Sequence, residues 1–316
     1  MIDVNEYEIY KTIEDLPVKT VCFAPEKAVV VKGVIQILHG MCEYKERYLD
    51  FIKYLNEQGY ICVINDMRGH GENVSFFKEL GYFGEDGHEL IIKDTHAVTV
   101  YIKNNFPDLP VILLGHSMGS LIARAVLKQY DDDYDKVILI GSPSNRFGKT
   151  FGLFLAEVLG LVRDEKKTSN LLDMLIMGPY FMKYKDEKEK YSWVCSDMDV
   201  VKEYSENMYC NFSFTINGYI TLLNIMKMVY SKKNWKMKNR RMPIIFMSGD
   251  GDPCMGNEKA FNKSVSYLKE AGYIHVESKL YEGMRHEILN EKDKMKVYKD
   301  IVDWLKDEEE EIVRYI

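Results

Sequence analysis

The sequence predicts an α/β fold, in which a mostly parallel central sheet is flanked by helices and interrupted by an inserted helical cap. Over residues 33–141, apolar runs that suit buried strands alternate with amphipathic helical patterns. This alternation stops over residues 143–241 and returns afterwards. We therefore divide the chain into a first core segment at 1–142, a helical cap at 143–241 and a second core segment at 242–316.

The first core segment shows strands and helices in a regular order. Short alternating stretches within residues 6–32 fit antiparallel edge strands. The run from Val34 to Leu38 is so apolar that we expect it to be buried on both faces, and hence central and parallel. The following elements are expected in order: a helix around 48–55 closed by Gly59, a strand at 61–65, a helix at 89–105, a strand at 112–114 with a helix behind it, and a strand at 136–141.

The second half of the chain begins with the cap and ends with further core elements. Apolar stretches at 151–159 and 220–230 enclose a segment rich in Met, Tyr and Phe, which favours a mostly helical structure. After Pro243 the alternation of strand and helix resumes. We expect a strand at 244–247, a helix at 258–271, a strand at 275–281 and a last helix at 294–308.

A G-x-S-x-G motif centred on Ser117 joins an apolar strand to a helical pattern. Such a turn is sharp enough to hold the serine in a strained conformation with its hydroxyl exposed. Gly115 and Gly119 fit because larger side chains would collide there. The backbone N–H of Met118, at a helix N-terminus, can donate to a developing oxyanion. The motif predicts a nucleophile, and its competing interpretation is a Gly-Ser turn with a solvated serine.

A serine nucleophile needs a base and an orienting acid, which we expect after it at the carboxyl ends of strands. Asp250 and Asp252 both follow the predicted strand at 244–247. We favour Asp252 as the acid, because Asp250 suits turn capping. Of the seven histidines, His286 alone follows the acid in a loop beyond a strand end, whereas His275 begins a strand. His286 is therefore the predicted base.

The loop after the first central strand supplies the second predicted oxyanion donor. In His39-Gly40-Met41, the glycine lets the backbone approach, and the N–H of Met41 is expected to point inward. Residues 66–71 combine Asp, Arg and His, but they precede the nucleophile, so we interpret them as a structural turn. Because the reaction needs neutral His286, we expect activity to fall on acidification through a pKa near ~6.5.

Composition excludes several classes of function. The net charge is −7, and the chain lacks the clustered basic footprint of a nucleic-acid-binding protein. The basic stretch at 232–241 is interpreted as a solvated surface, with a patch for anionic membrane head groups as the alternative. The six cysteines show no zinc-ligand spacing, and from the sequence we expect neither a signal peptide nor a membrane-spanning run. We expect a cytoplasmic protein with reduced thiols, no metal and no cofactor.

Taken together, these motifs resemble the α/β-hydrolase superfamily. The resemblance is greatest to the monoacylglycerol lipase and lysophospholipase-like branch, often labelled serine aminopeptidase S33-type hydrolases. It rests on His39-Gly40-Met41 with Glu43 and Arg47-Tyr48, on Asp66 to Gly71, on Gly115 to Ser120, on Gly249 to Pro253 and on His286 to Glu291. It implies catalytic roles for Ser117, Asp252 and His286, and oxyanion donors at Met41 and Met118. The cap at 143–241 lies outside it.

The residues and the resemblance predict a cofactor-independent serine hydrolase of carboxylic esters that works through an acyl-enzyme. A monoacylglycerol or lysophospholipid is the expected substrate, and the Met- and aromatic-rich cap is expected either to line an acyl channel or to pack as core. Transient contact of the cap with a membrane surface is a further hypothesis. Two alternatives stay open: an aminopeptidase-type or small-molecule esterase activity on the same triad, and a non-catalytic binding protein.

Overall fold

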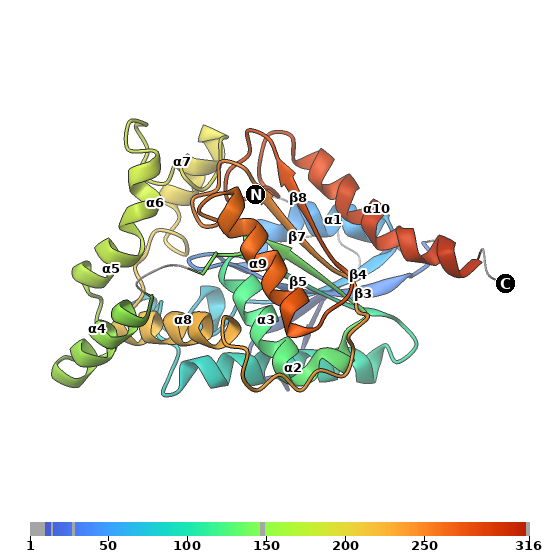
Figure 1. Ribbon diagram of the computed structural model, residues 1–316, viewed down its shortest axis with the longest axis horizontal. Coiled ribbons are helices and arrows are strands. Elements are labelled where there is room, and N and C mark those ends of the chain that lie inside the picture. Colours follow the sequence, from blue (N-terminus) through green and yellow to red (C-terminus); the bar gives the residue numbers. More distant parts are fainter. Residues whose placement is uncertain (1–9, 14, 27–28, 146–148, 314–316) are drawn as a thin grey trace.

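The computed structural model describes residues 10–13, 15–26, 29–145 and 149–313. Eight strands of these residues form one sheet in the order β1-β2-β4-β3-β5-β6-β7-β8 (Figure 1). β1 pairs with β2 and β2 with β4 in antiparallel fashion, and every other neighbouring pair is parallel. The bounds are β1 Tyr10–Ile13, β2 Thr20–Phe23, β3 Gly33–Leu38, β4 Tyr60–Asn65, β5 Val111–His116, β6 Lys136–Ile140, β7 Ile244–Gly249 and β8 Val276–Tyr281. The predicted mostly parallel α/β sheet is confirmed.

Helices cover both faces of this sheet, as the alternation in the sequence predicts. α1 (Leu49–Glu57) and α10 (Lys294–Val313) pack on one face (Figure 1). α2 (Gly87–Asn105), α3 (Met118–Tyr130) and α9 (Glu258–Ala271) pack on the other. The inner strands β3, β4 and β5 are buried along their whole length, because side chains of both orientations meet a helical layer.

A run of helices is inserted between β6 and β7 and lies at one end of the sheet, on the left in Figure 1. The helices are α4 Lys149–Val162, α5 Asn170–Ile176, α6 Gly178–Lys183, α7 Met198–Glu206 and α8 Ile216–Val229. Side chains cap three of their N-termini, since Ser169, Asp197 and Thr215 each accept a backbone N–H of the first turn. The inserted helical cap is confirmed as a structural element, while its limits at 143 and 241 stay a prediction.

Single-turn 3-10 helices occupy several of the connecting loops. They are η2 Lys45–Tyr48, η3 Gly71–Asn73, η4 Phe77–Glu79 and η5 Asp131–Asp133. The η2 turn matters most here, because it follows β3 and leads directly into α1 beside the candidate site.

Some predicted boundaries differ from those in the structure. The stretch at 20–24 was expected at an edge, but β2 lies between β1 and β4 and is buried. α10 continues to Val313, past the predicted end at 308, because the glutamates that follow are good helix formers. Across the described ranges, no helix combines the length and hydropathy that a bilayer span requires.

Candidate active site

Ser117 forms the turn between β5 and α3. Its backbone has φ 51° and ψ −115°, a conformation that residues with a Cβ rarely adopt. The flanking glycines allow this turn. A Cβ on Gly115 would lie 2.5 Å from the carbonyl oxygen of Gly119, and a Cβ on Gly119 would collide with the carbonyl oxygen of Leu38. The strained elbow expected from the motif is therefore present.

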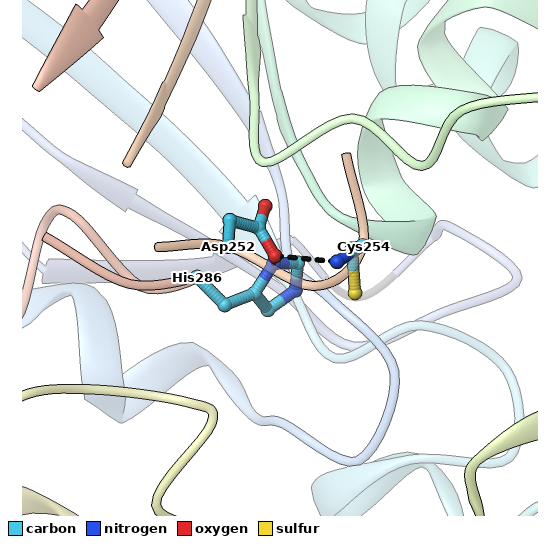
Figure 2. A group of neighbouring side chains, drawn as sticks. All are labelled: Asp252, Cys254 and His286. Carbon is cyan, nitrogen blue, oxygen red and sulfur yellow. Dashed lines mark hydrogen bonds and ion pairs between the residues drawn. The ribbon is translucent and has the colours of Figure 1, made fainter. Parts of the chain in front are cut away.

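His286, on the loop after β8, meets Asp252, on the loop after β7. Nδ1 of His286 lies 2.9 Å from Oδ1 of Asp252, and both side chains are buried. The backbone N–H of Cys254 donates to the same carboxylate oxygen at 2.7 Å (Figure 2). Asp250 is exposed and instead accepts the N–H of Gly283 at 2.9 Å. The structure thus brings Asp252, and not Asp250, to the histidine.

The ion pair perturbs the pKa of both partners. Burial is the largest single effect on the pKa of His286 and lowers it, but Asp252 and Cys254 together outweigh burial, so this pKa lies well above its ordinary value. Burial is also the largest single effect on the pKa of Asp252 and raises it, but His286 and the hydrogen bonds from Cys254 and Ser248 together bring it below its ordinary value. An unperturbed imidazole titrates at about 6.5, and the direction of this shift predicts an acid limb at a higher pH than that.

Ser117 and His286 face one cavity of about 310 Å³. Met41, Met118 and Cys254 line it as well. Within the described residues, the Ser117 hydroxyl makes no hydrogen bond to His286. Catalytic hydrogen bonds often form only once substrate is bound, so the serine–histidine bond stays a prediction.

The backbone donors expected for an oxyanion lie on the wall of this cavity. In the part of the chain that the structure describes, the N–H groups of Met41 and Met118 donate to no protein acceptor. The next N–H along, that of Cys42, is engaged, because it donates to Nε2 of His70 at 3.2 Å. Burial lowers the pKa of His70 to about 3, which keeps this ring neutral and able to accept. The N–H of Met41 is therefore available to an oxyanion, whereas that of Cys42 is not.

A buried polar network lies next to the cavity, and the sequence did not predict a role for it. Nδ1 of His116 lies 2.7 Å from Oε1 of Glu43, and the Tyr48 hydroxyl donates to Oε2 of Glu43 at 2.9 Å. Arg47 pairs with Glu287, with Nη2 donating to Oε2 at 2.6 Å. Burial raises the pKa of Glu43, but His116 and Arg47 lower it well below its ordinary value. The network joins the loop after β3 to the elbow and to the loop after β8.

All of these residues lie in the motifs on which the family resemblance rests, but no local pattern shows that they contact one another. Arg47 and Glu287, for example, are separated by 240 residues. The imidazole of His116 lies 4.8 Å, centroid to centroid, from that of His286. The network therefore includes the residue before the candidate nucleophile and lies beside the candidate base.

The Asp66 to Gly71 segment is structural, as the sequence analysis interpreted it. Asp66 accepts the backbone N–H of Lys45 at 2.8 Å and its ammonium at 2.9 Å. Arg68 forms two hydrogen bonds with Asp94 on α2, at 2.9 and 3.0 Å. His39 accepts the N–H of Met67 at 2.8 Å, which ties this segment to the loop after β3.

The cap supplies most of the apolar wall of the cavity. Its contributors include Ile176, Tyr180 and Trp193, and the Trp193 ring lies 5.1 Å from the His286 ring, centroid to centroid. Asp173 also lines the cavity, where it accepts the Tyr219 hydroxyl at 2.5 Å. The site thus combines a large apolar surface with few polar groups, which is typical of pockets for small apolar ligands.

Comparison with known proteins places these features in a family context. The sequence matches the family described as "Serine aminopeptidase, S33" over residues 30–293. It is 25% identical over 280 residues to the monoglyceride lipase homolog of Monkeypox virus, covering 87% of this chain and 89% of that protein. It is 26% identical over 274 residues to phospholipase YtpA of Bacillus subtilis, covering 84% and 92%. The structure is similar to that of a thermostable carboxyl esterase from Bacillus coagulans in complex with glycerol, with a TM-score of 0.84, 25% identity and coverage of 94% and 97%.

Proposed function

Because the chain belongs to the serine aminopeptidase S33 family of α/β-hydrolases, we propose that it is an ester hydrolase that uses Ser117 as nucleophile, His286 as base and Asp252 as orienting acid. One observation carries the proposal. The strained serine faces the same cavity as a histidine that a buried carboxylate holds at 2.9 Å.

The proposed reaction proceeds in two balanced steps. His286 takes the proton of the Ser117 hydroxyl while the oxygen attacks the ester carbonyl. The N–H groups of Met41 and Met118 then stabilise the oxyanion. The tetrahedral intermediate collapses, His286 returns the proton to the leaving alcohol, and an acyl-enzyme remains. Water activated by the same histidine then attacks the acyl-enzyme, and the carboxylic acid and free Ser117 are released.

A lipid with one acyl chain, either a monoacylglycerol or a lysophospholipid, is the proposed substrate. The apolar walls of the cavity favour an acyl chain, and the names of the monkeypox and Bacillus subtilis relatives point to the same class. An aminopeptidase would need a carboxylate to bind the substrate amine. Among the described cap residues that line the cavity, Asp173 is the one carboxylate, and Tyr219 already donates to it. Glu43 and Glu287 line the cavity from the core, but they are paired with His116 and Arg47. The ester reaction is therefore favoured.

The cap also carries an exposed apolar surface, which we call the cap patch. It consists of Phe151, Phe154, Val158, Leu161 and Val162 on α4, Leu171, Met174 and Leu175 on α5, and Met182 on α6. A patch of this kind beside a cavity is a candidate for contact with a membrane or a lipid aggregate. We propose that the cap patch makes this contact transiently, and that the protein acts in the cytoplasm.

The proposal is tested by activity-based labelling of the full chain with a fluorophosphonate probe and by a panel of p-nitrophenyl esters beside an aminoacyl naphthylamide. We expect labelling and ester turnover in the wild type. Ser117→Ala should abolish labelling and lower kcat by a factor of about 10⁶. Ser205→Ala, which alters a helical serine outside the cavity wall, serves as the matched control. Labelling that persists in Ser117→Ala would disprove the assignment, and a preference for the naphthylamide would favour the peptidase.

A further inference from the structure

Cys254 lies beside the His286–Asp252 pair, although the proposed hydrolysis gives it no step. One donor atom from each of the three side chains lies within 4.8 Å of the other two, and all three side chains are buried. Figure 2 shows that they come from two loops, with Asp252 and Cys254 on the loop after β7 and His286 on the loop after β8. The three donor types are a carboxylate, a thiol and an imidazole.

We propose that Asp252, Cys254 and His286 form an inhibitory site for a thiophilic divalent cation, with Zn²⁺ as its representative. Zinc binds carboxylate, thiolate and imidazole ligands at about 2.0–2.3 Å, so tetrahedral ligand atoms lie about 3.3–3.8 Å apart. The distance from Nδ1 of His286 to Oδ1 of Asp252 is 2.9 Å, slightly shorter than this range. All three ligand atoms lie within 4.8 Å of one another, which is slightly longer than this range. Small side-chain movements are enough to close the site.

Two of the three ligands border the cavity. Cys254 and His286 line it, and Asp252 is buried beside His286, so an ion that enters by the substrate route reaches the thiol and the imidazole first. Water then supplies the fourth ligand of the proposed tetrahedron. The carboxylate is already oriented by hydrogen bonds from its surroundings. Oδ2 of Asp252 accepts the Ser248 hydroxyl at 3.0 Å, and Oδ1 accepts the Cys254 N–H at 2.7 Å. Such supporting bonds strengthen metal sites.

Binding is balanced in protons and charge. The Cys254 thiol gives its proton to the solvent, and a protonated His286 gives one as well, so that the neutral imidazole binds the ion through one nitrogen and keeps one N–H on the other. The thiolate and the Asp252 carboxylate then neutralise the two positive charges of Zn²⁺, which suits a buried position.

Occupation of this site stops hydrolysis, because the ion engages both the base and the carboxylate that orients it. A chelator restores activity by removing the ion. Mg²⁺ and Ca²⁺ prefer oxygen ligands, so they should have no effect. The inference goes beyond the proposed function, since metal binding can be measured without turnover and would persist if Ser117 were not the nucleophile.

The test titrates the full chain with Zn²⁺ at buffered free concentrations. Binding is followed by competition with a chromogenic chelator, and activity with a soluble p-nitrophenyl ester. We expect one Zn²⁺ per chain, inhibition with the same midpoint as binding, and recovery with EDTA. Cys254→Ala should weaken both midpoints about tenfold or more. Cys22→Ala, which alters a buried cysteine on β2, should keep the wild-type midpoints.

Equal midpoints in Cys254→Ala and the wild type would overturn the proposal, as would inhibition without stoichiometric binding. A second measurement uses Co²⁺ on the wild type, so it does not depend on the folding of a variant at position 254. One equivalent should produce a thiolate-to-cobalt charge-transfer band in the near ultraviolet, which Cys22→Ala should retain. The absence of this band at saturating Co²⁺ would also overturn the proposal.

Discussion

At the scale of single residues, Asp252 sets the charge state of His286. Burial lowers the pKa of His286, but the carboxylate and Cys254 together hold it well above its ordinary value. The proposed base acts in its neutral form, so activity should rise as pH increases through this pKa. Asp252→Asn removes the negative charge, and burial then lowers the pKa of His286. We expect the acid limb of kcat/KM to move to lower pH and kcat to fall by about 10⁴.

The measurement is a pH–rate profile with a soluble ester for the wild type and Asp252→Asn. Asp250→Asn is the matched control, because Asp250 is exposed. The one interaction described for its side chain is the hydrogen bond that it accepts from the N–H of Gly283. Its acid limb should coincide with that of the wild type. An acid limb that does not move in Asp252→Asn would show that this carboxylate does not control the base.

At the scale of elements, the packing of α3 against the end of β3 depends on Gly119. A Cβ at this position would collide with the backbone carbonyl oxygens of Leu38 and His39, which cannot move independently of the strand. Gly119→Ala should therefore destabilise the fold by about 1–3 kcal/mol, even though alanine is the better helix former. Urea unfolding followed by circular dichroism gives this value.

Gly152→Ala is the matched control, since it makes the same change inside another helix. A Cβ there would meet Leu223 at 3.7 Å, an ordinary contact distance. We expect Gly152→Ala to be neutral or to stabilise the protein by up to about 1 kcal/mol. Equal stability of Gly119→Ala and the wild type would mean that α3 can move away from β3, contrary to the close packing described.

The elements also show what the sequence could and could not reveal. Parallel strands such as β3 and β5 are buried on both faces, so they appear as apolar runs that are easy to recognise. The cap is harder, because a Met- or Tyr-rich helix suits a packed core and a cavity wall equally well. The Glu43–His116 contact and the position of Cys254 beside His286 arise from loops that only the folded sheet brings together.

At the scale of the whole molecule, the two core segments build one site that the cap covers. β6 and β7 pair in parallel on either side of the insertion, and Arg47 in the first segment binds Glu287 in the second. The insertion therefore starts and ends at adjacent strands. Its helices reach the cavity that also holds Ser117 and His286, and any movement of the cap would change access to that cavity.

The cap patch leads to a prediction about the molecule at a lipid surface. Phe154 on α4 is 62% exposed, and burying such a side chain in a bilayer interface is worth about 1.5–3 kcal/mol at most. Phe154→Glu should therefore weaken binding to phosphatidylcholine vesicles about tenfold, measured by co-sedimentation. Val30→Glu is the control, because Val30 is 78% exposed but precedes the amino end of β3, whereas the cavity lies beyond the carboxyl ends of β3 and β5. Phe154→Glu should slow hydrolysis of a vesicle-borne ester and leave a soluble one unaffected. Equal vesicle binding by the two variants would show that the cap patch is not the contact surface.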